Sequence, residues 1–312
     1  MKRRSPRARN RRARAAAVVC LGATAVIALP AGAAASPRLR PATVAAPGEA
    51  ERVLRYWTPA RMRAARPLGA THADLANPFA QASFARVRTP NVPPYSYNGL
   101  LFVRQGRTPA FCSATAIDTP TRRLVLTAGH CLNSGPRRFG RPGVWSSFVE
   151  FVPAYANGTA PFGAFVARRN AVFAPRQWVR FANPNFDVGA ILVKPNAAGA
   201  KVADAVGGGA KIAANLSRRQ SFQTFGYPGN STVLQGCDSP YVGDDSFTYR
   251  IPGPPTMAIR CHWGPGASGG GWLTEGGTVI NGITSYGRPR DKVHTFSPYF
   301  SARNVGHLVA GL

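Results

Sequence analysis

Acidic side chains are scarce in this sequence of 312 residues, which has 12 Asp and Glu against 39 Lys and Arg. Internal repeats and sustained heptads are absent, which excludes a solenoid and a coiled coil. The sequence also lacks a recognition-helix pattern and zinc-finger spacing, so its positive charge does not predict a nucleic-acid partner. Because acids are rare and a buried carboxylate needs a partner, any acid in an apolar stretch is a candidate for a specific role.

The positive charge persists beyond the N-terminal region. From residue 91 onward the sequence has 22 Lys and Arg against 9 Asp and Glu, a net charge of +13. The basic residues occur singly and in pairs. Such a surface attracts anionic polymers, acidic cell-wall material or acidic substrates, and it also keeps a secreted protein soluble.

The first 35 residues have the pattern of a secretory signal peptide. An arginine-rich start is followed by an apolar run from Ala15 to Leu29 and by Ala33-Ala34-Ala35, a small-residue cleavage signal. The alternative is a membrane anchor, but the apolar run is shorter than the ~20 residues that a spanning helix needs. We therefore expect cleavage after residue 35 and secretion.

The cysteine count fits an exported protein. Of five cysteines, Cys20 lies in the predicted signal peptide, and the other four are an even number that predicts two disulfides in an oxidising compartment. Three pairings are possible, and proximity in sequence favours Cys112–Cys131 and Cys237–Cys261. A structural zinc site is the rival interpretation, but no CxxC pair or His-x-x-x-His spacing supports it. We expect no metal.

Two regions follow the signal peptide. Residues 36–94 are rich in alanine, proline and arginine, with one short helix expected before Pro59, and they predict a propeptide or a disordered linker. Residues 95–312 contain short apolar or alternating runs separated by Gly, Pro, Asn and Asp turns, which is typical of an all-β barrel or sandwich. The best helical pattern covers residues 301–312, at the C-terminus.

One glycine-rich stretch, "GPGASGGGW", surrounds Ser268. A serine hydroxyl needs a base before it can attack an acyl carbon. His130 is the best placed histidine, because it follows a buried-looking strand and a tight Ala-Gly bend and precedes Cys131. A histidine base in turn needs an acid on its other ring nitrogen. Asp187 opens the apolar stretch "VGAILV" and is the first choice, with Asp204, in an exposed-looking loop, as the second.

The order of these motifs resembles a known family. "TAGHC", "DVGAIL" and "GPGASGG" occur in the order found in the chymotrypsin-like serine peptidases. The opening run "SYNGLLFVRQGRTPAFCSATAID" and the cysteine seven residues before the serine are similar to the bacterial glutamyl-endopeptidase-like branch. The resemblance covers residues 95–312 and implies two six-stranded antiparallel β-barrels, an active site between them, and a short C-terminal helix.

The resemblance also implies roles for individual residues. Ser268 would be the nucleophile, His130 its base and Asp187 the group that orients the base. The backbone N–H groups of Gly266 and Ser268 would form the oxyanion hole. No cofactor is implied. Ala267 departs from the animal digestive members, which carry Asp at this position, so activation through that ion pair is excluded.

Substrate recognition is predicted from the same resemblance. Ser285, Tyr286 and Gly287 would pair with the substrate backbone as an added strand, and Thr284 would offer a hydroxyl to the first specificity pocket. His262 stands where trypsin-like members carry Asp, which excludes a preference for Lys or Arg. Histidine and the surrounding positive charge favour an acidic side chain; the alternative is that His262 is a surface residue beside a cysteine.

We therefore expect a secreted, monomeric serine endopeptidase that acts on protein or peptide substrates. The main alternative is a catalytically silent, protease-like secreted protein that binds anionic cell-wall polymers, and the intact set of His, Asp and Ser argues against it. An α/β-hydrolase is a weaker alternative, because that fold needs alternating helices and the order Ser, Asp, His.

Overall fold

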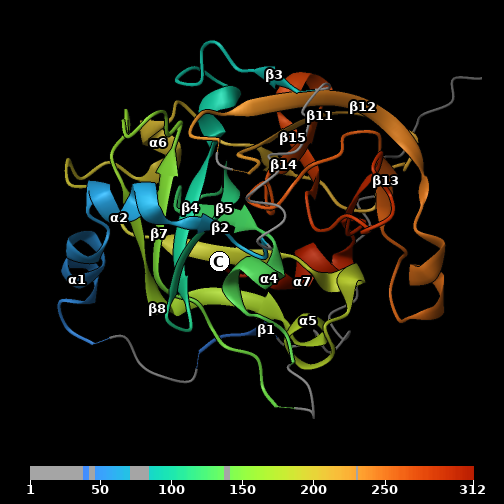
Figure 1. Cartoon of the computed structure of the whole chain (residues 1–312), viewed down its shortest axis with the longest axis horizontal. Helices are drawn as coiled ribbons and strands as arrows, with labels where there is room; N and C mark the ends of the chain where they lie inside the picture. Colours follow the sequence, from blue (N-terminus) through green and yellow to red (C-terminus); the bar gives the residue numbers. More distant parts are fainter. Residues whose placement is uncertain (1–37, 42–45, 71–83, 137–140, 230) are drawn as a thin grey trace, which may run out of the picture. The chain divides into compact units, whose positions relative to one another are not determined.

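The computed structural model describes residues 38–41, 46–70, 84–136, 141–229 and 231–312, which belong to one compact unit (Figure 1). The predicted signal peptide, residues 1–35, lies outside the described residues and stays a prediction. In the described part of the chain, no helix is both long enough and apolar enough to cross a bilayer.

Most of the described secondary structure is β-strand, in two sheets. The first sheet contains β1 (Arg38–Leu39), β2 (Arg66–Pro67), β4 (Asn98–Gln105), β5 (Thr108–Ile117), β6 (Leu124–Thr127), β7 (Ser147–Pro153), β8 (Phe165–Pro175) and β9 (Gly189–Val193). The second contains β3 (Ala85–Arg86), β10 (Lys211–Ile212), β11 (Ser221–Gly226), β12 (Gln235–Asp244), β13 (Met257–Ile259), β14 (Gly271–Thr274), β15 (Val279–Ile283) and β16 (Thr295–Ser297).

The helices are short. They are α1 (Glu49–Tyr56), α2 (Pro59–Ala64), α4 (Gly129–Leu132), α5 (Arg176–Phe181), α6 (Val202–Ala205) and α7 (His307–Val309), with a π-helical turn over Ala302–Gly306. Single 3-10 turns are η1 (Tyr95–Tyr97), η3 (Pro184–Phe186), η4 (Ser246–Arg250) and η5 (Glu275–Gly277).

The first sheet closes into a six-stranded antiparallel barrel. Its strands follow the order β8-β7-β4-β5-β6-β9, and β9 pairs back onto β8. Alternate side chains of each strand point inward, as the period of a strand requires, and fill the barrel with apolar groups. Leu101, Phe151 and Phe165 are among the fully buried ones. The predicted barrel is confirmed here.

The second sheet has six antiparallel strands in the order β15-β14-β11-β12-β13-β16, with β10 added at one edge in parallel to β15. An antiparallel bridge between Tyr286, just after β15, and Phe296 of β16 joins the two ends of the sheet. Its core contains the buried rings of Phe222, Trp263 and Trp272.

Each sheet carries one of the two expected disulfides. Cys112 of β5 is bonded to Cys131 of α4, and Cys237 of β12 is bonded to Cys261, just after β13. The chain ends in the expected short helical segment. Ser301 begins it by exchanging hydrogen bonds with Asn304, and Val305 and Leu308 pack into the core.

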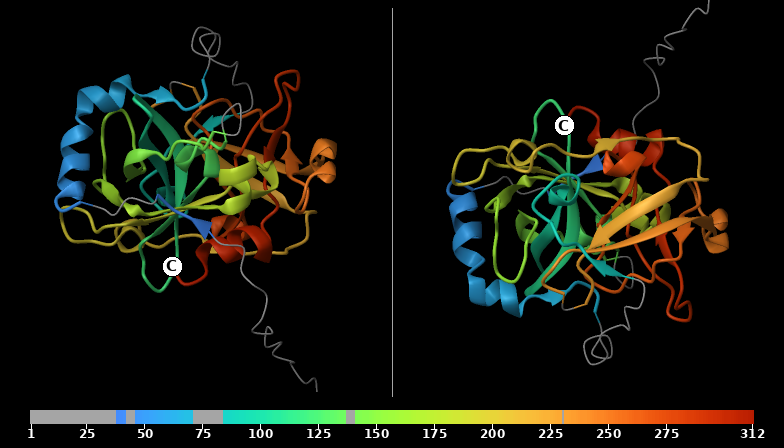
Figure 2. Two further views of the ribbon diagram at one scale, coloured as in Figure 1. Left: turned by 90° about the horizontal axis from the view of Figure 1, so that it is seen from below. Right: turned by 90° about the horizontal axis from the view of Figure 1, so that it is seen from above.

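The described parts of residues 36–94 pack on the two sheets. Helices α1 and α2 lie along one side of the first barrel (Figure 2). Trp57 is buried against that barrel, and its indole Nε1 donates to the carbonyl oxygen of Phe148 at 2.5 Å. The short strands β1, β2 and β3 pair with β8, β5 and β12. The predicted boundary at residue 94 stays a prediction.

Candidate active site

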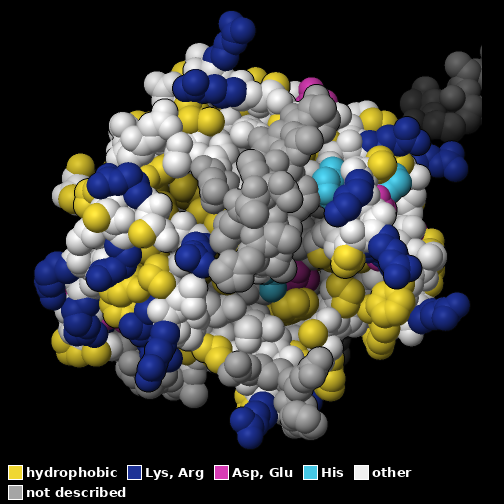
Figure 3. All heavy atoms as spheres, viewed as in Figure 1, with side chains coloured by type: hydrophobic (Ala, Val, Ile, Leu, Met, Phe, Trp, Pro, Cys, Tyr) yellow, Lys and Arg dark blue, Asp and Glu magenta, His cyan; other side chains and the backbone are white. Residues whose placement is uncertain are grey.

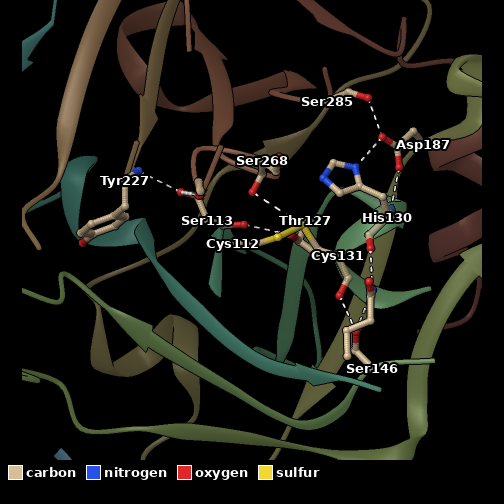
Figure 4. The surroundings of a disulfide bond; sticks show 12 residues. Cys112, Ser113, Thr127, His130, Cys131, Ser146, Asp187, Tyr227, Ser268 and Ser285 are labelled. Carbon is tan, nitrogen blue, oxygen red and sulfur yellow. Dashed lines mark hydrogen bonds and ion pairs between the residues drawn. A yellow bond between two sulfur atoms is a disulfide. The ribbon is translucent and has the colours of Figure 1, made fainter. Parts of the chain in front are cut away.

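A histidine and a carboxylate meet at the end of the first barrel. Strand β6 ends at Thr127, and the next turn opens α4, which carries His130. The His130 backbone N–H donates to Asp187 Oδ1 at 2.7 Å, and its ring Nδ1 lies 2.8 Å from Asp187 Oδ2 (Figure 4). Two contacts to one carboxylate fix both the backbone and the ring of His130.

Local structure explains why Asp187 is free to reach His130. Asn183, not Asp187, caps the 3-10 turn that precedes β9, because its side chain accepts from the N–H of Asn185. Asp187 is only 2% exposed, so its carboxylate must be satisfied by protein donors. The second choice from the sequence, Asp204, pairs with Arg122 instead and does not contact His130.

The carboxylate controls the protonation of the imidazole. Burial lowers the pKa of His130, but the charge of Asp187 and its hydrogen bond raise it, and the net shift of the pKa is upward. The imidazole is therefore a stronger base than a free histidine. Its hydrogen bond to Asp187 leaves Nε2 as the nitrogen that can accept a proton.

Ser268 lies on the turn that leads into β14 of the second sheet. It is 8% exposed and lines one cleft together with His130. In Figure 4 the imidazole of His130 lies between Asp187 and Ser268. The first barrel holds this turn, because the Ser113 N–H of β5 donates to the Ser268 carbonyl oxygen at 2.8 Å. The site thus combines side chains from both sheets.

Two glycines beside Ser268 are required by both conformation and space. Gly266 has φ +95°, and a Cβ there would lie 2.6 Å from the Tyr227 carbonyl oxygen. Gly269 has φ +84°, and a Cβ there would lie 2.1 Å from the Thr127 hydroxyl oxygen. Both values of φ favour glycine, and both approaches are too close for any side chain. The glycines therefore let the Ser268 turn pack closely against both sheets.

The backbone N–H groups of Gly266 and Ser268, predicted to form the oxyanion hole, are available to bind an oxyanion. The Ser113 hydroxyl donates to the Gly266 carbonyl oxygen at 2.9 Å and so orients this turn. Within the described residues, neither the N–H of Gly266 nor that of Ser268 donates to a protein acceptor. Two such N–H groups beside a serine can stabilise an oxyanion.

The cleft around Ser268 has a volume of about 610 Å³ and contains every residue predicted to bind substrate. These residues are His262, Thr284, Ser285, Tyr286 and Gly287. Among the described residues, its lining includes the cations Arg288 and Lys292 and no Asp or Glu. On the face in Figure 3, Lys and Arg side chains are scattered and far outnumber acidic ones.

Three of the predicted substrate-binding residues also have contacts that the sequence did not predict. The Ser285 hydroxyl donates to Asp187 Oδ2 at 2.5 Å, so it supports the carboxylate. Thr284 Oγ1 accepts from the Trp272 indole at 3.1 Å. The Tyr286 hydroxyl donates to Asp245 Oδ2 at 2.7 Å.

Other residues around His130 were missed by the sequence analysis. The Gln105 side chain donates to the His130 carbonyl oxygen at 3.0 Å, and the Trp178 ring lies 6.1 Å from the imidazole, between ring centres. No sequence motif marks either residue, because each reaches His130 from a distant strand or helix.

No metal-binding set is available in the described part of the chain. The one cluster of metal-ligating residue types there is Cys112, His130 and Cys131. Both cysteines are in a disulfide and offer no thiolate.

Burial and the charge of Lys292 lower the pKa of His262, which keeps that imidazole neutral near pH 7.

A closed six-stranded barrel and a second six-stranded sheet, with a histidine–carboxylate pair and a serine in one cleft, define a serine protease fold of the chymotrypsin type. No protein-family model matches the sequence, and no curated protein is similar to it. Solved structures of other proteins are similar to this chain. The protease Anisep from Arthrobacter nicotinovorans is 30% identical with a TM-score of 0.58, over 66% of this chain and 90% of that one.

Two further solved structures agree. The thermostable serine protease AL20 from an extremophilic microorganism is 27% identical with a TM-score of 0.60, over 68% of this chain and 95% of that one. A Glu endopeptidase is 16% identical with a TM-score of 0.56, over 73% and 96%, which shows a common fold. The chain belongs to the chymotrypsin-like serine proteases.

Proposed function

We propose that this protein is a secreted serine endopeptidase in which Ser268 is the nucleophile, His130 the general base and Asp187 the group that orients the base. The observation that carries the proposal is the carboxylate of Asp187, which binds both the backbone and the ring of His130 beside Ser268. The net upward shift of the His130 pKa supports the role of a base.

The reaction follows from these positions. Ser268 Oγ attacks the scissile carbonyl carbon while His130 Nε2 takes the hydroxyl proton. The N–H groups of Gly266 and Ser268 donate to the oxyanion that forms. The C–N bond then breaks, His130 returns the proton to the leaving amine, and an acyl-enzyme remains. Water attacks this ester by the same steps and restores Ser268.

The lining of the cleft supports a preference for an acidic residue on the acyl side of the cut bond. Lys292 and Arg288 bring positive charge to the cleft, and His262 adds a polar ring to its wall. Among the described residues that line the cleft, no carboxylate would repel an acidic substrate. The Glu endopeptidase shares the fold, which agrees with this proposal.

A matched peptide pair tests the acidic preference. We expect cleavage after Glu to exceed cleavage after Gln by at least about tenfold, since one charged contact is worth roughly 1.5–3 kcal/mol. Lys292→Gln should reduce this ratio. Lys211→Gln is the control, because Lys211 is exposed on β10, outside the cleft. A ratio near one in the unmodified enzyme would refute the preference.

Secretion is supported by the two disulfides, which persist in oxidising compartments. The proposed signal peptide is residues 1–35. N-terminal sequencing of protein collected outside the cells should find Ser36 or a later residue first. A secreted chain that still begins at Met1 would contradict this assignment.

The contacts of the N-terminal segment support the proposal that the protein has a latent, zymogen-like form. Leu68 and Gly69 line the same cleft as Ser268 and His130. The Leu68 N–H donates to the Phe111 carbonyl oxygen at 2.9 Å, which adds β2 to β5. Two residues of the proposed propeptide, residues 36–94, thus form part of the cleft wall, which supports a form in which this segment restricts access. Removal of residues 36–94 would open the cleft. This activation would not need the ion pair of the animal digestive members, which Ala267 excludes.

A fluorophosphonate probe tests both catalysis and latency. We expect the probe to label Ser268, with no labelling of Ser268→Ala. Slow labelling of the secreted chain, with faster labelling after residues 36–94 are removed, would support latency. Leu68→Ala should label faster than the intact chain, whereas Leu54→Ala, on the exposed side of α1, should not. No labelling in any form would overturn the proposal of an endopeptidase.

A further inference from the structure

A buried carboxylate that the mechanism does not use lies on the outer face of the first barrel. Strand β7 carries the Phe151 ring toward the inside of this barrel, so the preceding residue, Glu150, faces the other way. The neighbouring strands place Phe102 and Val166 directly opposite Glu150. Glu150 is nevertheless only 1% exposed, so another part of the chain must cover it.

Helix α1 covers this part of the barrel (Figure 2). Its inner face is apolar and includes the buried side chains of Val53 and Trp57. The centre of the Trp57 ring lies 5.3 Å from that of Phe102, the cross-strand neighbour of Glu150. The Trp57 indole also donates to the carbonyl oxygen of Phe148, two residues before Glu150. These contacts place the inner face of α1 over Glu150.

In the described part of the chain, no counter-charge offsets the burial of this carboxylate. The charged and titratable groups of the surrounding elements are Glu49, Glu51, Arg52, Arg55 and Tyr56 of α1, Arg61 and Arg63 of α2, Arg104 of β4, Arg168 and Arg169 of β8, and Tyr155 after β7. None of these groups forms an ion pair with Glu150. Arg61 and Arg104 instead lie over the Tyr56 ring, at 4.2 and 5.8 Å from its centre. Burial therefore raises the pKa of Glu150 to about 8.

The segment that covers Glu150 also reaches the Ser268 cleft. The chain runs from α1 through α2 into β2, which pairs with β5, and Leu68 and Gly69 then line the cleft. Pro67 of β2 lies beside the Ser268 turn, because a Cβ on Gly266 would lie 3.3 Å from the Pro67 Cβ. Release of α1 would free this stretch at its N-terminal side. The cover over Glu150 and the lining of the cleft are thus parts of one continuous stretch of chain.

We propose that Glu150 is a pH-sensitive switch for the proposed latent form: its neutral carboxyl lets α1 cover the barrel, and loss of its proton to solvent favours release of the N-terminal segment and opens the cleft. This inference rests on the proposed endopeptidase function and adds a means of regulation to it. A carboxylate is costly to bury without a partner and becomes hydrated once α1 leaves. The segment therefore stays attached in acid and is released more readily as pH rises.

The direction of the effect follows from the two states of Glu150. While α1 covers this side chain, its pKa is raised to about 8, and once water reaches it the pKa falls toward the ordinary value of 4.5. The covered form therefore binds the proton more tightly. Its stabilisation is complete below about pH 4.5 and is lost as pH rises toward 8, by at most about tenfold in the equilibrium constant for each pH unit.

Hydrogen exchange tests whether Glu150 controls the cover. The Trp57 N–H donates to the Val53 carbonyl oxygen and reports the attachment of α1, whereas the Leu68 N–H reports that of β2. Glu150→Gln keeps the shape of the side chain but cannot lose a proton. At pH 4.5 the parent and this variant should exchange within about threefold of each other, and at pH 7.5 the parent should exchange at least about tenfold faster at both amides.

Glu51→Gln is the matched control for this experiment. It removes a carboxylate from the exposed face of α1 and should exchange like the parent at both pH values. If the parent and Glu150→Gln exchange at equal rates at pH 7.5, Glu150 does not control the cover and the inference is overturned.

Two further variants test whether α1 is what buries Glu150. In Val53→Ala/Trp57→Ala the helix loses two buried side chains, so water should reach Glu150. Its pKa, measured by NMR titration of the carboxyl carbon, should then fall from about 8 toward 4.5. Leu54→Ala, on the exposed side of α1, should leave it near 8. A pKa that stays near 8 in the double variant would show that the barrel itself buries Glu150, and would refute the switch.

Labelling of Ser268 by fluorophosphonate connects the switch to the cleft. Each comparison is made at one pH, so the protonation of His130 cancels. The labelling rate of the parent relative to that of Glu150→Gln should rise at least about fivefold from pH 5.5 to pH 7.5. If Ser268 is labelled but this ratio does not change, the switch is refuted and the endopeptidase stands. If no form is labelled, the proposed function fails, while hydrogen exchange and the titration still decide whether Glu150 controls the cover.

Discussion

At the scale of single residues, a buried carboxylate sets the chemistry of the base. Asp187 accepts three hydrogen bonds, two from His130 and one from Ser285. Burial alone would lower the pKa of His130, and the carboxylate reverses this effect. The pair therefore predicts a measurable dependence of activity on pH.

We expect kcat/KM to rise with pH through an apparent pKa above 6.5, the usual value for histidine, because only neutral His130 can accept the serine proton. Asp187→Asn should lower kcat by about 10⁴. It should also move the acid limb to lower pH, because burial then acts alone. A pH profile of peptide cleavage measures both effects. An acid limb that stays in place in the variant would contradict this account.

Another residue, Glu150, is buried without an ion pair in the described part of the chain. It lies on β7 between Phe102 and Val166 of the neighbouring strands, and its Oε2 has no hydrogen-bond partner among the described residues. Burial raises its pKa from 4.5 to about 8. The folded state therefore holds this proton more tightly than the unfolded state does.

Glu150→Gln tests this buried acid. The stability that comes from the raised pKa is complete below about pH 4.5 and is lost as pH rises toward 8. At pH 8 the variant should be more stable than the parent by about 2–4 kcal/mol, with little difference at pH 4. Urea unfolding at both pH values measures this. Glu275→Gln, on an exposed turn, is the control.

At the scale of elements, the N-terminal segment is attached by helix α1 and by the short strands β1, β2 and β3. Trp57, at the end of α1, is buried against the first barrel, and β2 pairs with β5 near the cleft. The sequence predicted a short helix before Pro59, and α1 confirms it. It could not predict β1, β2 or β3, because strands of two residues carry no pattern and form only through their barrel partners.

Trp57→Ala should loosen this segment. Loss of a buried Trp costs about 3–5 kcal/mol, and here the cost falls on the contact between α1 and the barrel. We expect faster hydrogen exchange at the Leu68 amide and faster labelling of Ser268 by fluorophosphonate. Unchanged exchange at Leu68 would show that β2 is held independently of α1.

At the scale of the whole molecule, the sequence predicted the features that short motifs mark. It did not predict the contacts between residues that lie far apart in the chain. The barrel class and the candidates His130, Asp187 and Ser268 are each marked by neighbouring residues in the sequence. Ser285 reaches Asp187 across 98 positions, and Asp245 reaches Arg288 across 43. Such contacts depend on how the fold brings distant segments together, and no run of residues along the chain records that.

One disulfide lies beside His130 and the other beside His262, in the two halves of the site. The Cys112–Cys131 bond ties β5 to the helix of His130, and the Cys237–Cys261 bond ends directly before His262. Both close loops of similar length, with separations of 19 and 24 residues, so removing either should cost about 3 kcal/mol of stability. Their effects on activity should nevertheless differ.

Replacing Cys112 and Cys131 with alanine should slow the labelling of Ser268 by fluorophosphonate, because the base loses its fixed position. Replacing Cys237 and Cys261 should leave labelling within about threefold but reduce the Glu-to-Gln ratio, since the small probe does not need the part of the cleft that receives an acidic side chain. Labelling rates and peptide kinetics well below each variant's melting temperature compare the two. If both variants lose labelling and selectivity together, the two halves of the site do not act separately, and the division of roles between the sheets is wrong.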